Sequence, residues 1–429
     1  MAERRTVVIG LDGMPFGLIR DLAAEDAMPN TQQLIAEGVF RRMTSSIPEI
    51  SSVAWSSVIT GTNPGVHGIF GFTDLAPGTY RLVFPNFNSL KAPPFWEWKR
   101  SGRSVILNVP STFPARPLNG VMVAGFVALD LERATYPPSL VPHLREMDYR
   151  VDVDAQTAHK SLPLFLQDLE HTLQARIKAY RYLWEREEWD TFVLVFTGTD
   201  RLAHFLWDAY EDPTHTYHTA FVNHLRRIDE VIGEIARRIT SNDVLMMLSD
   251  HGFGKLEYDV YINFFLRQRG FLKLAKDPPR GPQDIADGAL AFALDPGRIY
   301  FHLKERFPRG PLSRADREAL LDELTAAFEE LEIEGRKVVQ RVYRREEIYT
   351  GPQAERGPDL VLLPHDGFNL RGSLKARKLH GKDVFTGKHT HADAFLLVWG
   401  EGARESTPDR PSVSDVVHVM EELRERRRG

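Results

Sequence analysis

The sequence predicts an α/β fold, a doubly wound and mostly parallel sheet that is flanked by helices and carries an insertion. The apolar runs 6–11, 191–196 and 244–249 show no polar alternation, which is typical of strands buried on both faces of a parallel sheet. Segments with helical periodicity alternate with these runs, and this order is typical of right-handed crossovers. Shorter apolar runs predict five further strands, at residues 103–107, 120–126, 298–301, 359–363 and 395–399.

Helical periodicity predicts the elements that cover the sheet. Residues 18–37 form helical pieces that break at a proline. Apolar residues at helical spacing over 173–184 and 225–239 predict two helices that each bury one face. The spacing of Ser313 and Asp316 is that of a capping box, with Asp in place of Glu or Gln, and it predicts the start of another helix.

Residues 127–166 lack this regularity and contain several prolines. We expect them to form an insertion that caps the functional site. The remaining residues, 1–126 and 167–429, are expected to form one core, and a chain of this length can bury a large one. No internal repeat or low-complexity segment interrupts the pattern.

The composition is that of an ordinary soluble globular protein, with 42% hydrophobic and 26% charged residues and a formal net charge of −5. This charge gives no sign of a nucleic-acid surface or a polybasic membrane anchor. No apolar run reaches the roughly 20 residues of a spanning helix, and the run at 6–11 is too short for a signal peptide. We therefore expect a cytoplasmic location and no membrane partner, while nothing in the sequence indicates the oligomeric state.

Two serines, Ser51 and Ser52, follow a proline-containing turn and open a predicted helix that ends at Thr60-Gly61. The start of a helix offers free backbone N–H groups and the positive end of its dipole, so phosphate binds there readily. A hydroxyl in this place could attack a bound phosphoryl group once its proton is removed. The alternative is that Ser51 or Ser52 only caps the helix.

Acidic and imidazole side chains follow the strongest predicted strands. Asp12 ends the first run, Asp200 follows the second, and Asp250-His251 follow the third, before flexible glycines. The carboxyl ends of parallel strands meet at one edge of a sheet, which is where α/β folds bind ligands. Taken singly, Asp12 is better explained as a turn or cap residue, whereas Asp250-His251 favours a metal site.

Two further histidines can join this group. His204 lies four residues after Asp200, so the two share one face if a helix begins there. His389 lies on a glycine-containing loop before the strand predicted at 395–399. The chain has no cysteine, so any transition-metal site must use His, Asp and Glu. Two divalent ions about 4 Å apart would need about as many oxygen and nitrogen ligands as these residues offer. One of the two ions could then remove the proton of the Ser51 hydroxyl, so that no side-chain base is needed.

The ordered set resembles the alkaline phosphatase superfamily, in its type I phosphodiesterase/nucleotide pyrophosphatase branch. Gly10 to Gly13 is similar to the opening metal motif of that branch. The stretch from Ser51 to Thr60-Gly61, followed by His67-Gly68-Ile69, is similar to the nucleophile segment of the branch. Counted back from Thr60-Gly61, the nucleophile corresponds to Ser51, and its neighbour Ser52 is the second candidate. The remaining metal motifs are similar, in order, to 200–207, 250–252 and 387–389, and the resemblance spans nearly the whole chain.

The resemblance implies an alkaline-phosphatase-like core and a covalent phospho-enzyme that is then hydrolysed. It also implies two divalent ions, zinc in most characterised relatives of the branch and manganese in mutase relatives. One ion would be held by Asp200, His204 and His389. The other would be held by Asp12, Asp250 and His251, with Ser51 as a bridging ligand.

The chain departs from the branch in ways that bear on its substrate. Branch members carry an Asn soon after His-Gly-Ile that contacts the phosphoryl group, whereas Phe70 to Thr73 occupy that stretch here. Asn108 is a candidate substitute for substrate binding, with a structural role in a turn as the alternative. His391 is an alternative ligand to His389. A sulfatase is disfavoured, because the Cys- or Ser-x-Pro-x-Arg signature is missing around Ser51.

The sequence therefore predicts a metal-dependent phosphoryl-transfer hydrolase, a phosphodiesterase, nucleotide pyrophosphatase or phosphatase, that acts on a small-molecule phosphate ester. Its likeness over 200–207 and 108–114 is to a subgroup of predicted phosphohydrolases and phosphomutases, so a metal-dependent phosphomutase is the first alternative. The second alternative is a non-catalytic metal-binding protein that acts through interactions.

Overall fold

The computed structural model describes residues 4–128 and 130–426. These residues divide into two compact units. Of these residues, the first unit comprises 4–62, 86–128, 130–254 and 389–426, and the second comprises 63–85 and 255–388. No sequence pattern had indicated this division.

The first unit is built on an eight-stranded sheet in the order β2-β20-β9-β1-β8-β5-β6-β7. Five neighbouring strands are parallel: β9, β1, β8, β5 and β6. The strands at the two edges alternate in direction, because β20 is antiparallel to β9, β2 to β20 and β7 to β6. The bounds are β1 Thr6–Leu11, β2 Val39–Met43, β5 Ser104–Leu107, β6 Gly120–Val123, β7 Thr135–Tyr136, β8 Thr191–Phe196, β9 Val244–Leu248 and β20 Ala394–Trp399.

The three central strands are buried along their whole length, as their unbroken apolar runs predicted. They also end side by side, since Leu11 pairs with Phe196 and Gly10 pairs with Leu248. The antiparallel β20 begins at this same edge, where Leu396 pairs with Leu248. Residues that follow β1, β8 and β9 and residues that precede β20 are thus brought together. The mostly parallel α/β sheet predicted from the sequence is confirmed.

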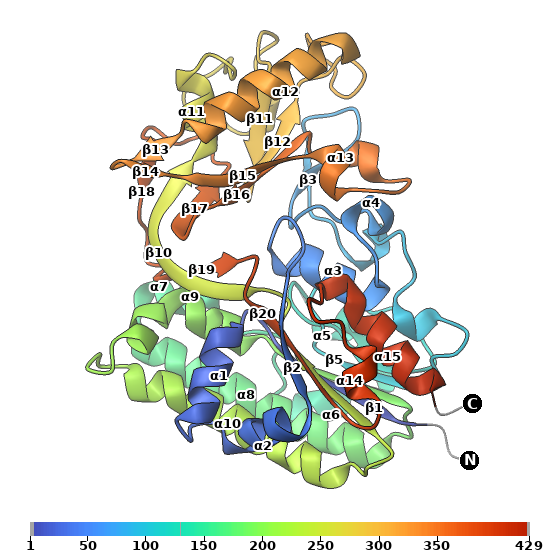
Figure 1. Cartoon of the computed structure of the whole chain (residues 1–429). Helices are drawn as coiled ribbons and strands as arrows, with labels where there is room; N and C mark the ends of the chain where they lie inside the picture. The colour runs from blue at the N-terminus through green and yellow to red at the C-terminus, as the bar shows by residue number, and fades with distance from the viewer. Residues whose placement is uncertain (1–3, 129, 427–429) are drawn as a thin grey trace. The chain divides into compact units, whose positions relative to one another are not determined.

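Helices flank this sheet. Figure 1 shows α3, α14 and α15 grouped on one side of the strands and α1, α2, α8, α9 and α10 on the other. The predicted break within 18–37 is confirmed, because Pro29 is the first residue of α2. The bounds are α1 Phe16–Ala24, α2 Pro29–Glu37, α3 Ser51–Thr60, α8 Leu162–Arg186, α9 Gly198–Glu211, α10 His218–Arg238, α14 Ala403–Ser406 and α15 Val416–Glu425.

The described residues of 127–166 belong to the first unit. They include α5 (Leu131–Ala134), the edge strand β7, α6 (Val141–Glu146) and α7 (Ala155–Lys160), and they end inside α8. The segment therefore contributes to the edge of the central sheet. Its role as a cap stays a prediction.

The second unit has its own hydrophobic core, formed around an antiparallel sheet in the order β11-β12-β16-β15. The capping box predicted at Ser313 and Asp316 is present at the start of α12. A second sheet joins β17, β10 and β18. The bounds are β10 Gly252–Tyr261, β11 Ala291–Leu294, β12 Arg298–Phe301, α12 Arg314–Glu329, β15 Val339–Arg344, β16 Leu360–Pro364, β17 Gly367–Arg371 and β18 His380–Gly381. Within the described part of the chain, every helix is too short or too polar to cross a bilayer.

Candidate active site and metal centre

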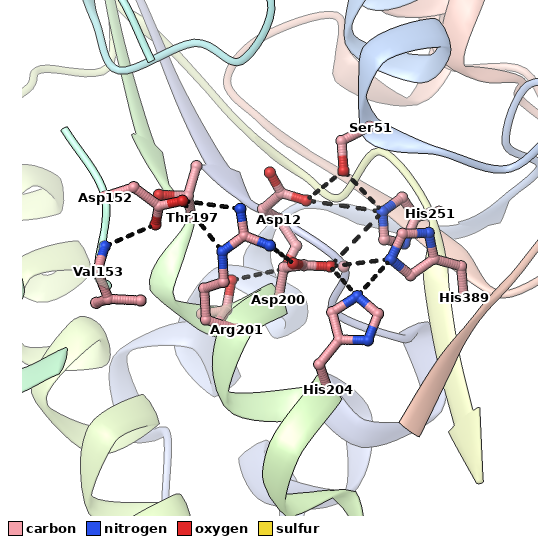
Figure 2. Close-up of polar contacts among 12 residues, drawn as sticks. Asp12, Ser51, Asp152, Val153, Thr197, Asp200, Arg201, His204, His251 and His389 are labelled. Carbon is pink, nitrogen blue, oxygen red and sulfur yellow. Dashed lines mark hydrogen bonds and ion pairs between the residues drawn. The ribbon is translucent and has the colours of Figure 1, made fainter. Parts of the chain in front are cut away.

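Ser51 and Asp12 meet at the carboxyl edge of the central sheet, in the first unit. Asp12 directly follows β1, and Ser51 is the first residue of α3. The Ser51 hydroxyl donates to Asp12 Oδ1 over 3.3 Å, and the indole Nε1 of Trp55 donates to Asp12 Oδ2 over 3.3 Å (Figure 2 shows the serine and the aspartate). Both carboxylate oxygens of Asp12 are thus oriented by side chains of one helix.

The N-cap of α3 is Ile50, and no side chain makes a capping hydrogen bond there. The alternative in which Ser51 or Ser52 only caps the helix is therefore wrong. The Ser51 hydroxyl instead faces Asp12 and His251, with 3.1 Å between its Oγ and His251 Nε2. The Oγ of Ser52 is buried and has no hydrogen-bond partner among the described residues.

Asp250 and His251 lie between β9 and β10 and are completely buried. Asp250 Oδ1 accepts a hydrogen bond from the backbone N–H of Gly13 at 3.1 Å. The other oxygen, Oδ2, has no hydrogen-bond partner in the described chain and lies 3.4 Å from His251 Nε2. His251 Nδ1 donates to the carbonyl oxygen of Gly252 at 3.0 Å. That contact fixes the tautomer and leaves a lone pair on Nε2, as in metal-ligating histidines.

Asp200, His204 and His389 form the neighbouring group. Asp200 and His204 lie one turn apart on α9, as the sequence predicted, with 3.5 Å between Asp200 Oδ1 and His204 Nε2. His389 Nε2 lies 3.1 Å from Asp200 Oδ1 and 3.0 Å from His204 Nε2 (Figure 2). On the other side of the ring, His389 Nδ1 donates to the carbonyl oxygen of Glu49 at 3.0 Å. One expectation is corrected, since His389 lies within a short strand, β19 (Gly387–Thr390), and not on a loop.

Among residues 4–128 and 130–426, two sets of three residues have ligand atoms that all lie within 4.8 Å of one another. One set is Asp12, Asp250 and His251, and the other is Asp200, His251 and His389. His251 belongs to both sets, because its Nε2 also lies 4.0 Å from Asp200 Oδ1. The two sets therefore adjoin, with Ser51 beside the shared imidazole.

The pKa values of these side chains are shifted because the groups are buried and lie close to one another. Burial raises the pKa of Asp12 well above its usual range, and the negative charges of Asp250 and Asp200 raise it further. Burial also raises the pKa of Asp250 to about 7, and the charge of Asp200 acts in the same direction. Burial alone would raise the pKa of Asp200, but the nearby imidazoles of His204 and His389 hold it below its usual range. Burial lowers the pKa of His251 to about 4, and nearby His389 adds to this effect.

These donors fit divalent cations. The carboxylates packed beside His251, whose imidazole is neutral at physiological pH, and the Asp250 Oδ2 without a hydrogen-bond partner in the described chain suit a bound cation. Oxygen and nitrogen donors without thiolates suit hard or borderline ions such as Mn²⁺ and Zn²⁺.

Arg201 is a residue of the site that the sequence reasoning missed. Its Nη1 donates to Asp200 Oδ2 at 3.2 Å, and its guanidinium also binds Asp152 (Figure 2). The only signal in the sequence was its position next to Asp200. Its partner Asp152 lies in the irregular segment 127–166, where no pattern marks it.

Two predicted residues are not part of this arrangement. Asn108 is buried with a left-handed φ of 66°, its amide donates to Val195 and Thr197, and its Oδ1 accepts from Tyr149. These contacts favour the role in a turn that was the alternative. His389 belongs to one ligand set and His391 to neither, which favours His389. His204 is also outside both sets, but its Nε2 lies 3.0 Å from His389 Nε2 and 3.5 Å from Asp200 Oδ1.

Comparison with known proteins gives a consistent result. The sequence model described as type I phosphodiesterase/nucleotide pyrophosphatase matches residues 6–391. The fold is similar to that of phosphonoacetate hydrolase from Sinorhizobium meliloti 1021 in complex with phosphonoformate, with a TM-score of 0.67 and 18% identity over 98% of this chain and 96% of that one. It is also similar to an inactive murine ectonucleotide pyrophosphatase/phosphodiesterase 5 in complex with AMP, with a TM-score of 0.59 and 13% identity over 99% and 95% of the two chains. No curated protein sequence matches the chain.

Proposed function

The chain belongs to the type I phosphodiesterase/nucleotide pyrophosphatase family and is a phosphoric ester hydrolase, and on this premise we propose that it transfers phosphoryl groups with two metal ions and a serine nucleophile, Ser51. The observation that carries the proposal is the position of the Ser51 hydroxyl. It lies at the start of α3, 3.3 Å from Asp12 Oδ1 and 3.1 Å from His251 Nε2, beside two adjoining sets of metal-ligand atoms.

We assign the ligands as the family resemblance implied. Asp12, Asp250 and His251 would hold one divalent cation, and Asp200, His204 and His389 would hold the other, with Ser51 between them. When bound, such a pair of zinc or manganese ions lowers the pKa of a nearby hydroxyl and offsets the negative charge of phosphoryl oxygens.

The residues of the chain prepare the serine for attack. The single hydroxyl proton of Ser51 has two acceptors within reach, Asp12 Oδ1 and His251 Nε2, and the indole of Trp55 in turn orients Asp12. The N-terminus of α3 adds a positive electrostatic potential where the phosphoryl group would lie. Burial of the surrounding groups strengthens each of these interactions, because little water screens them.

The reaction then has two displacements. In the first, the bond from Ser51 Oγ to phosphorus forms, the ester P–O bond breaks, and the departing alkoxide gains, over the whole step, the proton that Ser51 loses. In the second, a water oxygen bonds to phosphorus, the Oγ–P bond breaks, and Ser51 regains a proton. The products are an alcohol and a phosphate or phosphate monoester.

A turnover assay tests this proposal. Metal-free protein and protein reloaded with Zn²⁺ or Mn²⁺ would be assayed on aryl phosphate monoesters and diesters. Esters of AMP and phosphonoacetate would be included, because similar structures contain AMP and phosphonoacetate. We expect hydrolysis only after reloading, its loss in Ser51→Ala, and its retention in the neighbouring variant Ser52→Ala. Turnover that is insensitive to chelation would contradict the proposal, and transfer of phosphate without net release would indicate a phosphomutase instead.

A further inference from the structure

Arg201 joins two carboxylates that come from distant parts of the first unit. Its Nη1 donates to Asp200 Oδ2 at 3.2 Å, while its Nε and Nη2 donate to Asp152 Oδ2 at 3.1 and 2.8 Å (Figure 2). The side chains of Arg201, Asp152 and Asp200 are only 16%, 13% and 7% exposed. Solvent and salt therefore screen these charges weakly, and the planar guanidinium fixes the direction of both acceptors.

This arrangement separates the two oxygens of Asp200 by function. Oδ2 accepts from Arg201, whereas Oδ1 faces the imidazoles of His389 at 3.1 Å and His204 at 3.5 Å. Rotation of the Asp200 carboxylate would break the contact with Arg201. Arg201 thus determines which oxygen is presented to the candidate metal ligands.

Arg201 is itself held on two sides. Its guanidinium carbon lies 4.2 Å from the centre of the Phe126 ring, a cation–π contact. Asp152, on the other side, has its own orientation fixed, because the backbone N–H of Val153 donates to Asp152 Oδ1 at 3.0 Å.

The backbone that carries Asp152 is tied to the central sheet. The buried Arg176 donates to the carbonyl oxygens of Arg150 and Val151 at 3.1 and 2.8 Å and to that of Val195 on β8 at 2.9 Å. Asp200 follows this same strand. The acidic partner of Arg201 is therefore fixed relative to the strand that positions Asp200.

We infer that Arg201 and Asp152 are positioning residues of the metal centre. Arg201 orients the Asp200 carboxylate, and Arg201 is in turn oriented by Asp152, which lies in the segment 127–166. This inference rests on the proposed two-metal function. It gives that segment a specific part in metal binding. Residues that support a metal ligand in this way typically change metal affinity by about 10- to 100-fold when they are altered.

The sign of the effect distinguishes positioning from simple charge repulsion. If orientation dominates, removal of the guanidinium weakens metal binding because Asp200 is free to turn. If repulsion between Arg201 and the cation dominates, the same change tightens metal binding, since a positive charge near the site is lost. The two explanations therefore predict opposite shifts in the dissociation constant.

The test measures Zn²⁺ and Mn²⁺ affinity of the full chain by titration calorimetry. We expect Arg201→Met, which keeps the aliphatic stem, to weaken binding by about 10- to 100-fold, and Arg201→Lys to restore part of it. Asp152→Asn should weaken binding less. The double variant should bind no worse than Arg201→Met alone, because Asp152 acts through Arg201.

A matched control is the Arg5–Asp243 pair, in which Arg5 Nε and Nη2 bind Asp243 at 3.2 and 3.0 Å. Asp243→Asn breaks a similar pair that is absent from both ligand sets and should leave metal affinity unchanged. If Arg201→Met fails to fold, Arg201→Lys and Asp152→Asn give the answer.

Unchanged or tighter metal binding in the Arg201 variants, or additive losses in the double variant, would overturn the inference. A wild-type chain that binds no metal would instead contradict the proposed function, so the two failures can be told apart.

Discussion

Ser51 Oγ and His251 Nε2 lie 3.1 Å apart, although 200 positions separate the two residues in the chain. Their approach follows from the parallel sheet, because His251 follows β9, one strand away from the β1 strand whose Asp12 also contacts Ser51. The His251 ring is held by the carbonyl oxygen of Gly252 so that its lone pair faces the serine.

Replacement of Asp250 by Asn should remove one metal ion. Asn can still accept the hydrogen bond from Gly13, but it carries no charge and can place an NH₂ donor where Oδ2 now lies 3.4 Å from His251 Nε2. We expect elemental analysis to find about one ion fewer per chain and the turnover number to fall by at least about 100-fold. Full metal content in Asp250→Asn would contradict the ligand assignment.

The two neighbouring histidines, His389 and His391, provide an internal control for each other. His389 Nε2 lies 3.1 Å from Asp200 Oδ1, whereas His391 belongs to neither ligand set. His389→Ala should therefore weaken metal binding by about 10- to 100-fold, and His391→Ala should have little effect. Metal titrations of the two variants under the same conditions compare them directly, and a larger loss in His391→Ala would reverse the assignment.

In the metal-free protein, the contribution of Asp250 to stability should fall as the pH rises. Burial raises the folded-state pKa of Asp250 to about 7, above the value of about 3.9 in an unfolded chain. The folded state therefore binds this proton more tightly, so the contribution of Asp250 is fully present below about pH 4 and is lost as the pH rises through 7. Asp12, whose pKa is also raised by burial and by Asp250, acts in the same direction.

Denaturant unfolding of the metal-free chain at pH 5 and pH 8 measures this effect. Buried histidines such as His251, whose pKa burial lowers to about 4, add stability as the pH rises in both chains. We therefore expect the free energy of unfolding of the wild type to fall more, or to rise less, between pH 5 and pH 8 than that of Asp250→Asn. Metal-loaded protein should gain stability toward pH 8, because the cation binds the deprotonated carboxylates. An identical pH dependence in the wild type and in Asp250→Asn would show that this carboxyl does not titrate as described.

Gly10 supports the site through the close packing of Trp55 against β1. A Cβ atom at Gly10 would lie 2.4 Å from Trp55 Cη2 and 3.0 Å from Val195 Cγ2. Gly10→Ala should displace the indole that donates to Asp12 and lower the free energy of unfolding by about 1–3 kcal/mol. Gly17→Ala is the matched control, since its Cβ would meet only Asp393 Oδ2 at 3.8 Å, and it should be neutral or slightly stabilising. Equal stability of the two variants in denaturant unfolding would contradict this account.

The parts of the site that could be predicted from the sequence are those fixed by strand ends. Asp12 and Asp250 follow unbroken apolar runs, and a parallel sheet brings the ends of such runs together. His389 was a candidate because it lies on a glycine-containing stretch before a predicted strand, and the resemblance to a family favoured it over His391. Its position depends on the antiparallel direction of β20, which an apolar run does not reveal.

Other features left no readable pattern. The contact between Arg201 and Asp152 spans 49 positions and involves an irregular segment without periodicity. The division into two units was not predicted, although strands of the second unit were, because that unit combines two separate segments, 63–85 and 255–388. One of its strands, β11, has only four residues and lies at the end of a stretch rich in polar residues, proline and glycine. Short pairings of this kind depend on tertiary packing, which the local sequence does not determine.

The most direct test of a metal-dependent serine nucleophile is to locate phosphate on protein quenched during turnover of an aryl phosphate ester, by tandem mass spectrometry of the peptide that contains residues 51 and 52. We expect phosphate on Ser51 in metal-loaded protein and none after chelation. Phosphate on Ser52, or labelling that persists without metal, would contradict the account.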